Sequence, residues 1–291
     1  MILPFRPRRS AQAYEKIWTN HGSPLTLHTK TLAAEIEARL GDRYRVTFGM
    51  RYQNPPITEA VERLHSEGCD PIVVLPLFPQ YASASGGSAL EEALGVIGRG
   101  WKIPTVRTIG PFYDDARYLG SVAAVARPLL DAFEPDHVLF SYHGLPERQV
   151  ARVDGTDQWC LATPECCARV TSVNAYCYRA QSYATTAALA AGMGLEPESY
   201  STSFQSRLAG QKWIEPYTDK ELPRLREQGV RKLAVLTPSF VADCLETIEE
   251  IGIRGRHQWQ QLGGDELLLV PCLNADEEWA EAVADMVREA E

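Results

Sequence analysis

The chain has 291 residues, of which 45% are hydrophobic and 23% charged, so it can bury a sizeable core and is not a disordered or fibrous protein. Lys and Arg total 29 against 38 for Asp and Glu, which gives a net charge of −9. Beyond the short cluster of Arg6, Arg8 and Arg9, the sequence has no basic stripe. We therefore expect an ordinary soluble globular protein with no nucleic-acid partner.

The hydrophobic segments and the cysteine content both indicate the cellular compartment of the protein. The longest apolar run, residues 72–78, is too short to span a bilayer and contains Pro76, and the start of the sequence does not read as a secretory leader. Seven cysteines are too few for a disulfide scaffold, and in a reducing compartment clustered thiols more often bind metal or do chemistry. We expect a cytoplasmic protein.

Short β-branched runs alternate with longer amphipathic stretches. Helical patterns separate most of these runs, which is typical of an α/β fold with parallel sheets. The predicted strands are residues 44–50, 72–78, 106–109, 137–142, 200–204, 232–237 and 267–270.

Helix signals fit this pattern. Ser23 can cap free N–H groups and Pro24 suits a first turn, so together they predict a helix that ends at Gly41. Residues 58–67 form a second predicted helix. Asn274 is placed to cap a final helix, whose apolar stripe is Trp279, Val283, Met286 and Val287.

A break near residues 131–136 divides the chain into two unequal halves, each of which reads as a small doubly wound sheet. The predicted domains are residues 1–133 and 134–272, and residues 273–291 form a helix that packs back on the first domain. Because ligands of open α/β sheets bind at the carboxyl ends of strands, functional residues are sought directly after strands.

His143 directly follows a predicted apolar strand. An imidazole there could accept a proton near neutral pH or bind a metal. A buried histidine bonded to the backbone explains the position equally well.

Asp243, Glu246 and Glu250 are spaced three and then four residues apart, which predicts one acidic face at the start of a helix. Such a face could pass a divalent cation or accept protons. The alternative is that these acids only complement the helix dipole.

Four cysteines, Cys160, Cys166, Cys167 and Cys177, fall within 18 residues. Their thiolates could hold Zn²⁺ or a [2Fe–2S] cluster. The absence of paired C-x-x-C motifs favours the iron–sulfur cluster, and incidental buried cysteines are the alternative.

Two more stretches follow predicted strands. The small residues of 80–88 could approach a ligand closely, or form the loop before a helix. Residues 205–207 and Trp213 offer a cation and a flat ring, which could face a planar ligand or pack in the core.

Taken together, these residues resemble ferrochelatases, the enzymes that insert Fe²⁺ into a porphyrin in the last step of haem synthesis. The stretches that contain His143 and Asp243 to Glu246 are the most specific. The resemblance extends along nearly the whole chain, through residues 6–10, Tyr14, 22–24, 50–52, 79–81, 141–146, 204–207, Trp213 and 243–247.

The resemblance implies two Rossmann-like domains with a porphyrin cleft between them. His143 would be the catalytic histidine and Glu246 its partner carboxylate, with both able to contact the metal. Asp243 and Glu250 would line a path for metal or protons. The residues that would hold the macrocycle are Arg8, Arg9, Tyr14, Tyr52, Tyr81 and Trp213. The Arg8-Arg9 stretch favours protoporphyrin IX over coproporphyrin.

Some ferrochelatases carry a [2Fe–2S] cluster. In one variety three ligands lie in a C-terminal extension; this sequence ends at Glu291 without it, and Ser83 stands where the fourth cysteine is expected. A second variety gathers all four cysteines in one internal segment, which Cys160, Cys166, Cys167 and Cys177 resemble. The resemblance therefore implies a structural or regulatory cluster.

Two departures from the family stand out. Cys244 occupies a position that is often histidine. The family also begins with a strand, a helix and an apolar lip that precede the position of Met1 here. We therefore expect a first domain without its usual first strand, and a native product some tens of residues longer.

Two rival functions remain open at this point. One is a related chelatase that loads another metal into a tetrapyrrole. The other is a truncated, non-enzymatic protein that binds porphyrin or senses iron. The sequence leaves the oligomeric state open, and peripheral membrane contact could depend on the lip.

Overall fold

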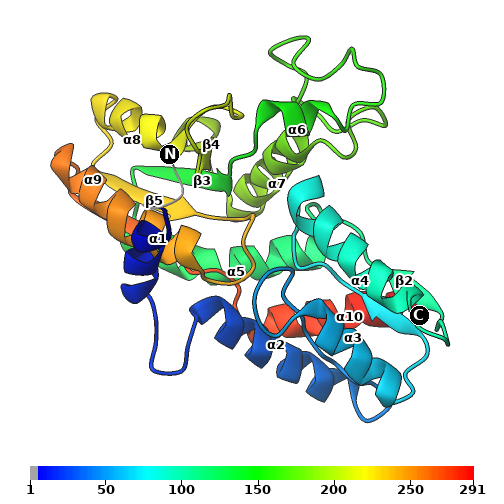
Figure 1. Ribbon diagram of the computed structural model, residues 1–291. Coiled ribbons are helices and arrows are strands. Elements are labelled where there is room, and N and C mark those ends of the chain that lie inside the picture. The colour runs from blue at the N-terminus through cyan, green and yellow to red at the C-terminus, as the bar shows by residue number, and fades with distance from the viewer. Residues whose placement is uncertain (1–5) are drawn as a thin grey trace.

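The structure, a computed structural model, describes the backbone of residues 6–291 and the side chains from Ser10 onward. Its larger sheet has four parallel strands in the order β4-β3-β5-β6, and its smaller sheet pairs β1 with β2 in parallel (Figure 1). The strands are β1 Ile72–Val74, β2 Val106–Thr108, β3 His137–His143, β4 Tyr200–Gln205, β5 Lys232–Leu236 and β6 Glu266–Leu269. The predicted α/β class with parallel sheets is confirmed.

Helices join and cover these strands. The α-helices are α1 Arg6–Glu15, α2 Pro24–Leu40, α3 Ile57–Ser66, α4 Ser88–Gly98, α5 Ala116–Phe133, α6 Glu147–Ala151, α7 Tyr178–Met193, α8 Thr218–Glu227, α9 Arg256–Gln261 and α10 Glu277–Ala290. Two π-helices, η1 Ser83–Gly87 and η3 Leu245–Gly255, and one 3₁₀ turn, η2 Pro197–Ser199, complete the described elements. None of the helices between residues 6 and 291 is long and apolar enough to cross a bilayer.

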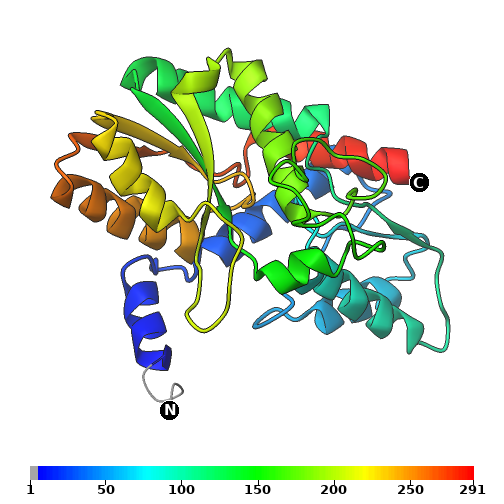
Figure 2. The ribbon, with the colours of Figure 1, turned by 90° about the horizontal axis from the view of Figure 1, so that it is seen from above.

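Strand β3 lies inside the larger sheet and is buried on both faces. Its alternate side chains Val138 and Phe140 join a core that α5 and α7 cover, whereas Leu139 joins a second core beneath α8, α9 and η3. This division follows from the two-residue period of a strand. Figure 2 shows the helices on either side of this sheet.

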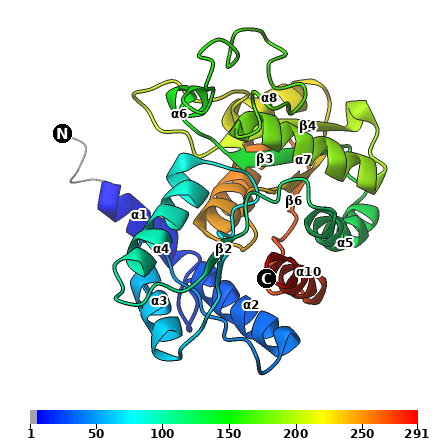
Figure 3. The same ribbon diagram turned by 90° about the vertical axis from the view of Figure 1, so that its right-hand side faces the viewer.

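A third core lies between α2, α5 and α10. Leu32 and Ile36 of α2 share this core with Trp279 and Met286 of α10, so the C-terminal helix packs against the first half of the chain. Figure 3 shows α10 between α2 and α5. Helix α5 ends at Phe133, next to the predicted domain break, and contributes to two of the cores.

The predicted strand at 44–50 is wrong. The N–H of Val46 donates to the Glu37 side chain at 3.1 Å, and the N–H of Met50 donates to the Pro55 carbonyl at 2.7 Å. The segment therefore has no ladder partner apart from one bridge between Met50 and Pro56. Its apolar pattern reflects packing, since Val46 contacts the core between α2 and α10.

The predicted helix ends are right in position but wrong in two capping details. Helix α2 begins at Pro24 after Ser23 and stops before Gly41, yet the Ser23 side chain makes no capping hydrogen bond. Asp276, rather than Asn274, caps α10 by accepting from the N–H groups of the two residues Glu278 and Trp279. Asn274 instead bonds to Asp243.

Candidate active site

His143 is the last residue of β3 and lies half-buried at the carboxyl end of the strand. Its ring Nδ1 lies 2.6 Å from the Gly144 carbonyl oxygen. Because a carbonyl can only accept, Nδ1 carries the ring proton and Nε2 is the basic nitrogen. The His143 backbone N–H donates to the Ser239 hydroxyl at 3.0 Å, which fixes this strand end. His143 is therefore oriented to accept a proton, or to bind a metal, through Nε2.

Gln205, the last residue of β4, joins the His143 strand to the acidic segment. Its carbonyl accepts from the Gly144 N–H at 2.8 Å, and its side-chain oxygen accepts from the Ser141 hydroxyl at 2.7 Å. Its side-chain amide donates to the Glu246 carbonyl at 2.7 Å. Since Gln205 is only 3% exposed, losing either side-chain bond would leave a buried polar group unpaired. One residue thus fixes the positions of His143 and Glu246 relative to each other.

Glu246 lies in the first turn of η3, the π-helix. The preceding turn is closed by Thr247, whose hydroxyl accepts from the Cys244 N–H at 3.0 Å. Burial, and then the charge of Glu246, hold the pKa of the Cys244 thiol well above its ordinary value, so this sulfur is a neutral thiol. π-helical turns are rare and occur frequently at functional sites. Glu246 thus stands at the start of a π-helical turn, two positions after Cys244.

Asp243 does not share a helix face with Glu246 and Glu250, contrary to the prediction. It precedes η3, and its carboxylate accepts from the Asn274 amide at 2.8 Å and from the Thr247 hydroxyl at 2.9 Å. The α-helical spacing fails here because an extended residue, Cys244, comes before the helix and the helix itself has π geometry. Asp243 supports the turn beneath Glu246, and its place on a metal path stays a prediction.

Two acids of η3 tie other segments to the site. The Glu250 carboxylate accepts from the Ser206 N–H at 2.9 Å and from its hydroxyl at 2.6 Å, which holds the loop after β4. Glu249 is only 4% exposed and lies 3.0 Å from Lys16 and 2.8 Å from Arg254. Although burial opposes the charge, Arg254 and Lys16 keep the pKa of Glu249 below its ordinary value. The sequence patterns did not indicate the roles of Lys16, Glu249 or Ser206.

The predicted porphyrin-binding aromatics differ in their surroundings. Burial, and then the charge of Glu246, raise the pKa of Tyr14. Tyr52 is 69% exposed beneath the Arg51 guanidinium, which lies 4.9 Å from its ring centroid. Tyr81 packs edge-on against Tyr176 at 5.0 Å. These three rings are available at or near the surface.

Trp213 is instead buried at 6% exposure, and its backbone bridges to Pro146. A side chain on Gly144 would lie 3.2 Å from the indole and 2.7 Å from the Gln205 carbonyl, so the ring packs directly beside the His143 turn. Trp213 therefore supports that turn. Arg8 and Arg9 lie in α1, but their side chains fall outside the described part of the chain.

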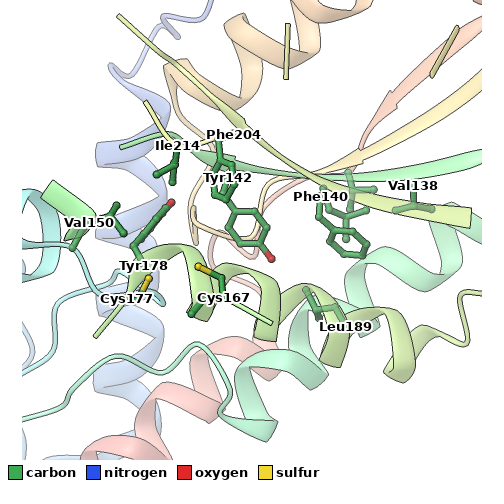
Figure 4. Close-up of a cluster of buried hydrophobic side chains, with 14 of the residues drawn as sticks. Val138, Phe140, Tyr142, Val150, Cys167, Cys177, Tyr178, Leu189, Phe204 and Ile214 are labelled. Atoms are coloured by element: carbon green, nitrogen blue, oxygen red, sulfur yellow. The ribbon is translucent and has the colours of Figure 1, made fainter. Parts of the chain in front are cut away.

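The four clustered cysteines line one cavity of about 10 Å³, next to Trp159 and Asn174. The sulfurs of Cys166 and Cys167 lie 3.6 Å apart, and all seven cysteines of the chain are free thiols. Figure 4 shows Cys167 and Cys177 beside Tyr178, the first residue of α7. Among residues 6–291, no three His, Cys, Asp or Glu side chains are arranged to hold a single metal ion.

Two polar residues that the sequence patterns did not indicate shape the cysteine segment. The Asp154 carboxylate accepts from the N–H groups of Trp159 and Cys160, both at 2.7 Å. The Asn174 amide donates to the carbonyls of Cys166 and Arg169, both at 3.0 Å. Both are buried, so the irregular loop has internal partners for its backbone.

The family model for ferrochelatases matches residues 1–291. The chain belongs to the ferrochelatase family. The ferrochelatase of Legionella pneumophila (strain Lens) is 44% identical over 290 residues, which cover 99% of this chain and 85% of that protein. The ferrochelatase of Coxiella burnetii (strain Dugway 5J108-111) is 44% identical over 289 residues, which cover 99% and 80%. The expectation of a longer native product stays a prediction.

Two solved structures share the fold of this chain. The chain resembles SirB from Bacillus subtilis with a TM-score of 0.58 and 16% identity, over 93% of this chain and 92% of that one. It also resembles DR2241 from Deinococcus radiodurans, a multi-domain protein described as similar to chelatases, with a TM-score of 0.54 and 14% identity, over 91% of this chain and 51% of that one. At these identities the likeness establishes the chelatase-like fold.

Proposed function

We propose that this protein inserts Fe²⁺ into protoporphyrin IX to form protohaem. The observation that carries the proposal is the bond network through Gln205, which ties the turn after His143 to the backbone of Glu246. The contact of Nδ1 with the Gly144 carbonyl leaves Nε2 as the basic nitrogen of His143. Membership of the ferrochelatase family supports the same reaction. The choice of protoporphyrin over coproporphyrin rests on the Arg8-Arg9 resemblance.

The reaction exchanges two pyrrole N–H protons for one ferrous ion. His143 is the proposed acceptor for the first proton, because its Nδ1 is already bonded to the Gly144 carbonyl and its Nε2 is basic. The resulting imidazolium keeps its Nδ1–H on that carbonyl. Proton transfer is therefore directed to one ring atom, whose position β3 and Ser239 hold.

Glu246 is the proposed partner for the metal or for the second proton. Its backbone is fixed by Gln205, and its charge contributes, after burial, to the raised pKa values of Tyr14 and the Cys244 thiol. A carboxylate is a suitable oxygen ligand for a divalent cation before that cation reaches the ring. The Glu250 carboxylate already accepts a hydrogen bond from Ser206, so we place Glu250 at the edge of the proposed path for metal or protons.

The test is anaerobic, Fe²⁺-dependent loss of porphyrin fluorescence in the wild type and in His143→Ala. We expect the substitution to lower turnover at least about 100-fold, the contribution typical of a positioned acid–base group. Arg148→Ala, a change at an exposed residue of α6, is the control and should keep turnover. Wild-type turnover in His143→Ala would remove His143 from the reaction. A preference for cobalt or nickel would favour the related chelatase, and porphyrin binding without turnover would favour the non-enzymatic alternative.

We also propose that Cys160, Cys166, Cys167 and Cys177 hold a structural or regulatory [2Fe–2S] cluster. All four line one cavity, and the 3.6 Å between two sulfurs is close to the ~3.8 Å that separates two thiolates on one tetrahedral ion with bonds of ~2.3 Å. A two-iron cluster needs its thiolates in pairs, so it fits this arrangement better than one zinc ion. When bound, the cluster would supply an electron-accepting group.

The cluster is tested by iron, sulfide and zinc analysis of anaerobically purified protein. We expect two irons and two sulfides per chain, with visible absorption that Cys167→Ser abolishes. Stoichiometric zinc with no visible absorption would contradict the proposal.

We propose a cytoplasmic location, because an iron–sulfur cluster and free thiols suit a reducing compartment. If the protein sediments with membranes and salt releases it, the protein makes peripheral contact with the membrane.

A further inference from the structure

Arg179 lies two residues after Cys177, in the first turn of α7, and its guanidinium bonds both to its own helix and to the loop after β4. Its Nε donates to the Glu215 carbonyl at 3.1 Å, and one of its terminal nitrogens donates to the Tyr183 hydroxyl at 3.2 Å. The same guanidinium lies 5.0 Å from the Tyr183 ring centroid. These contacts fix a positive charge at the base of the cysteine segment.

Glu215 belongs to a loop that bonds to the turn after His143. Glu215 follows Trp213 and Ile214 in the loop after β4, and the Ile214 N–H donates to the Leu145 carbonyl at 2.9 Å. Leu145 lies two residues after His143, so the loop packs against the turn that orients the catalytic histidine. Arg179 therefore bonds to Glu215, and the neighbouring residue Ile214 bonds to the His143 turn.

The other end of Arg179 faces the cysteine segment. The guanidinium lines a cavity of about 410 Å³ together with residues 161–164, between Cys160 and Cys166, and with Lys212 and Ile214 of the loop. Tyr183, whose hydroxyl accepts from Arg179, also connects the guanidinium to the cysteines. Both Cys167 and Tyr183 belong to the same core cluster.

We propose that Arg179 is a positioning residue that joins the [2Fe–2S] cluster to the active-site loop: its charge favours the reduced cluster, and its bond to Glu215 holds the Trp213 loop. The inference rests on the cluster proposed above. A cluster with four thiolate ligands is an anion, and one-electron reduction adds further negative charge. A fixed guanidinium at the base of the cysteine segment would therefore raise the reduction potential, as charge near the sulfurs does in general.

Three substitutions at Arg179 separate the charge from the hydrogen bond. Arg179→Met removes both, Arg179→Gln removes the charge but keeps an N–H donor, and Arg179→Lys keeps both in a different shape. Arg169→Met is the matched control, since it removes one exposed arginine two residues after Cys167. The readouts are the midpoint potential, from an anaerobic titration with dithionite as the electron donor, and the porphyrin KM.

We expect a lower midpoint potential in Arg179→Met and Arg179→Gln, and values near the wild type in Arg179→Lys and Arg169→Met. The porphyrin KM should rise about fivefold in Arg179→Met alone, the effect of one lost hydrogen bond of about 1 kcal/mol. Wild-type potential in Arg179→Gln, or wild-type KM in Arg179→Met, would overturn the inference. If Arg179→Met loses the cluster, Arg179→Gln decides the charge effect. Wild-type protein without a cluster would instead refute the cluster proposal and leave the loop prediction to be judged by KM.

Discussion

Gly144 has a backbone position that no other residue fits, because its missing side chain is what lets the His143 turn, Gln205 and Trp213 meet. An added Cβ would lie 2.7 Å from the Gln205 carbonyl, which is backbone and part of the network that holds Glu246. The turn would have to shift, and His143 would move with it. Sub-ångström placement of an acid–base group matters because proton transfer needs hydrogen-bond contact.

Gly144→Ala should therefore lower turnover at least about tenfold and destabilise the fold by about 1–3 kcal/mol, the usual cost of overpacking. The matched control is Gly95→Ala in the middle of α4, where an added Cβ meets nothing within 4 Å. That change should keep turnover and stabilise the protein by about 0.5–1 kcal/mol, because alanine is the better helix former. Turnover and urea unfolding of both variants check this; equal behaviour of the two would show that the close contact is unimportant.

His137, at the other end of β3, gives the fold a specific acid sensitivity. It is 7% exposed, and burial, with a smaller effect from Arg224, lowers its pKa from 6.5 to about 4. The folded state therefore holds the neutral ring, whereas the unfolded chain binds a proton below pH 6.5. Stability from this residue is fully present above pH 6.5 and is lost as the pH falls towards 4.

Between pH 7.5 and 5, this linkage should cost the wild type about 2 kcal/mol of unfolding free energy. His137→Gln, which has no titrating ring, should lack that part of the pH dependence even if it is less stable at neutral pH. Urea unfolding of both proteins at the two pH values measures the difference. Parallel curves for the two proteins would mean that the ring is protonated in the folded state.

At the scale of elements, the N-terminal helix α1 is joined to η3 through Lys16, which follows the helix and pairs with the buried Glu249. The same helix carries Tyr14 towards Glu246. Lys16→Met should let α1 move and raise the porphyrin KM by up to about fivefold, with kcat nearly unchanged, since a partly exposed ion pair contributes at most about 1 kcal/mol. Lys16→Arg should restore the wild-type KM.

The control for this prediction is Arg254→Met, which removes the other cation bonded to Glu249 and leaves α1 tethered. Each variant removes one ion pair of the Glu249 carboxylate, so a loss of stability in η3 itself would appear in both variants. We expect the KM to rise only in Lys16→Met. Faster hydrogen exchange of residues 6–18 in that variant alone would accompany the change, and equal KM values in both variants would contradict the role of the tether.

The sequence predicts elements well where one local signal decides them. Strand β3 follows from its apolar run, and α2 from Pro24 and Gly41, because both signals act within a few residues. The strand at 44–50 was wrong because an apolar run does not show whether a partner strand exists. Asn274 was placed as a cap because its bond to Asp243, 31 positions away, cannot be read locally.

The candidate site shows the same limit. Residue type and position after a strand indicate His143, and acidic spacing indicates Glu246, which the family resemblance makes its partner. The connection between their backbones depends on Gln205, a residue without chemistry of its own. The spacing of Asp243 and Glu246 assumed an α-helix, and no sequence signal indicated π geometry. Packing against other segments decides these details, and one sequence does not contain that information explicitly.

At the scale of the whole molecule, the three main cores are joined by shared elements. Helix α5 places Tyr118 in the core with α10 and Leu130 in the core with α7. Strand β3 places Phe140 in the α7 core and Leu139 in the core with α9. None of these three cores can lose its packing without removing support from its neighbour, so the regions that they join should unfold together.

Two fully buried tryptophans test that cooperativity from opposite ends of the molecule. Trp279 lies in the core of α2, α5 and α10, and Trp259 lies in the core beneath α8 and α9; both are 0% exposed. Each change to alanine should cost about 3–5 kcal/mol. Because α5 and β3 connect the cores, we expect calorimetry to show one transition in the wild type, which both Trp279→Ala and Trp259→Ala shift to lower temperature. Separate domains would instead give two transitions, with each variant lowering a different one.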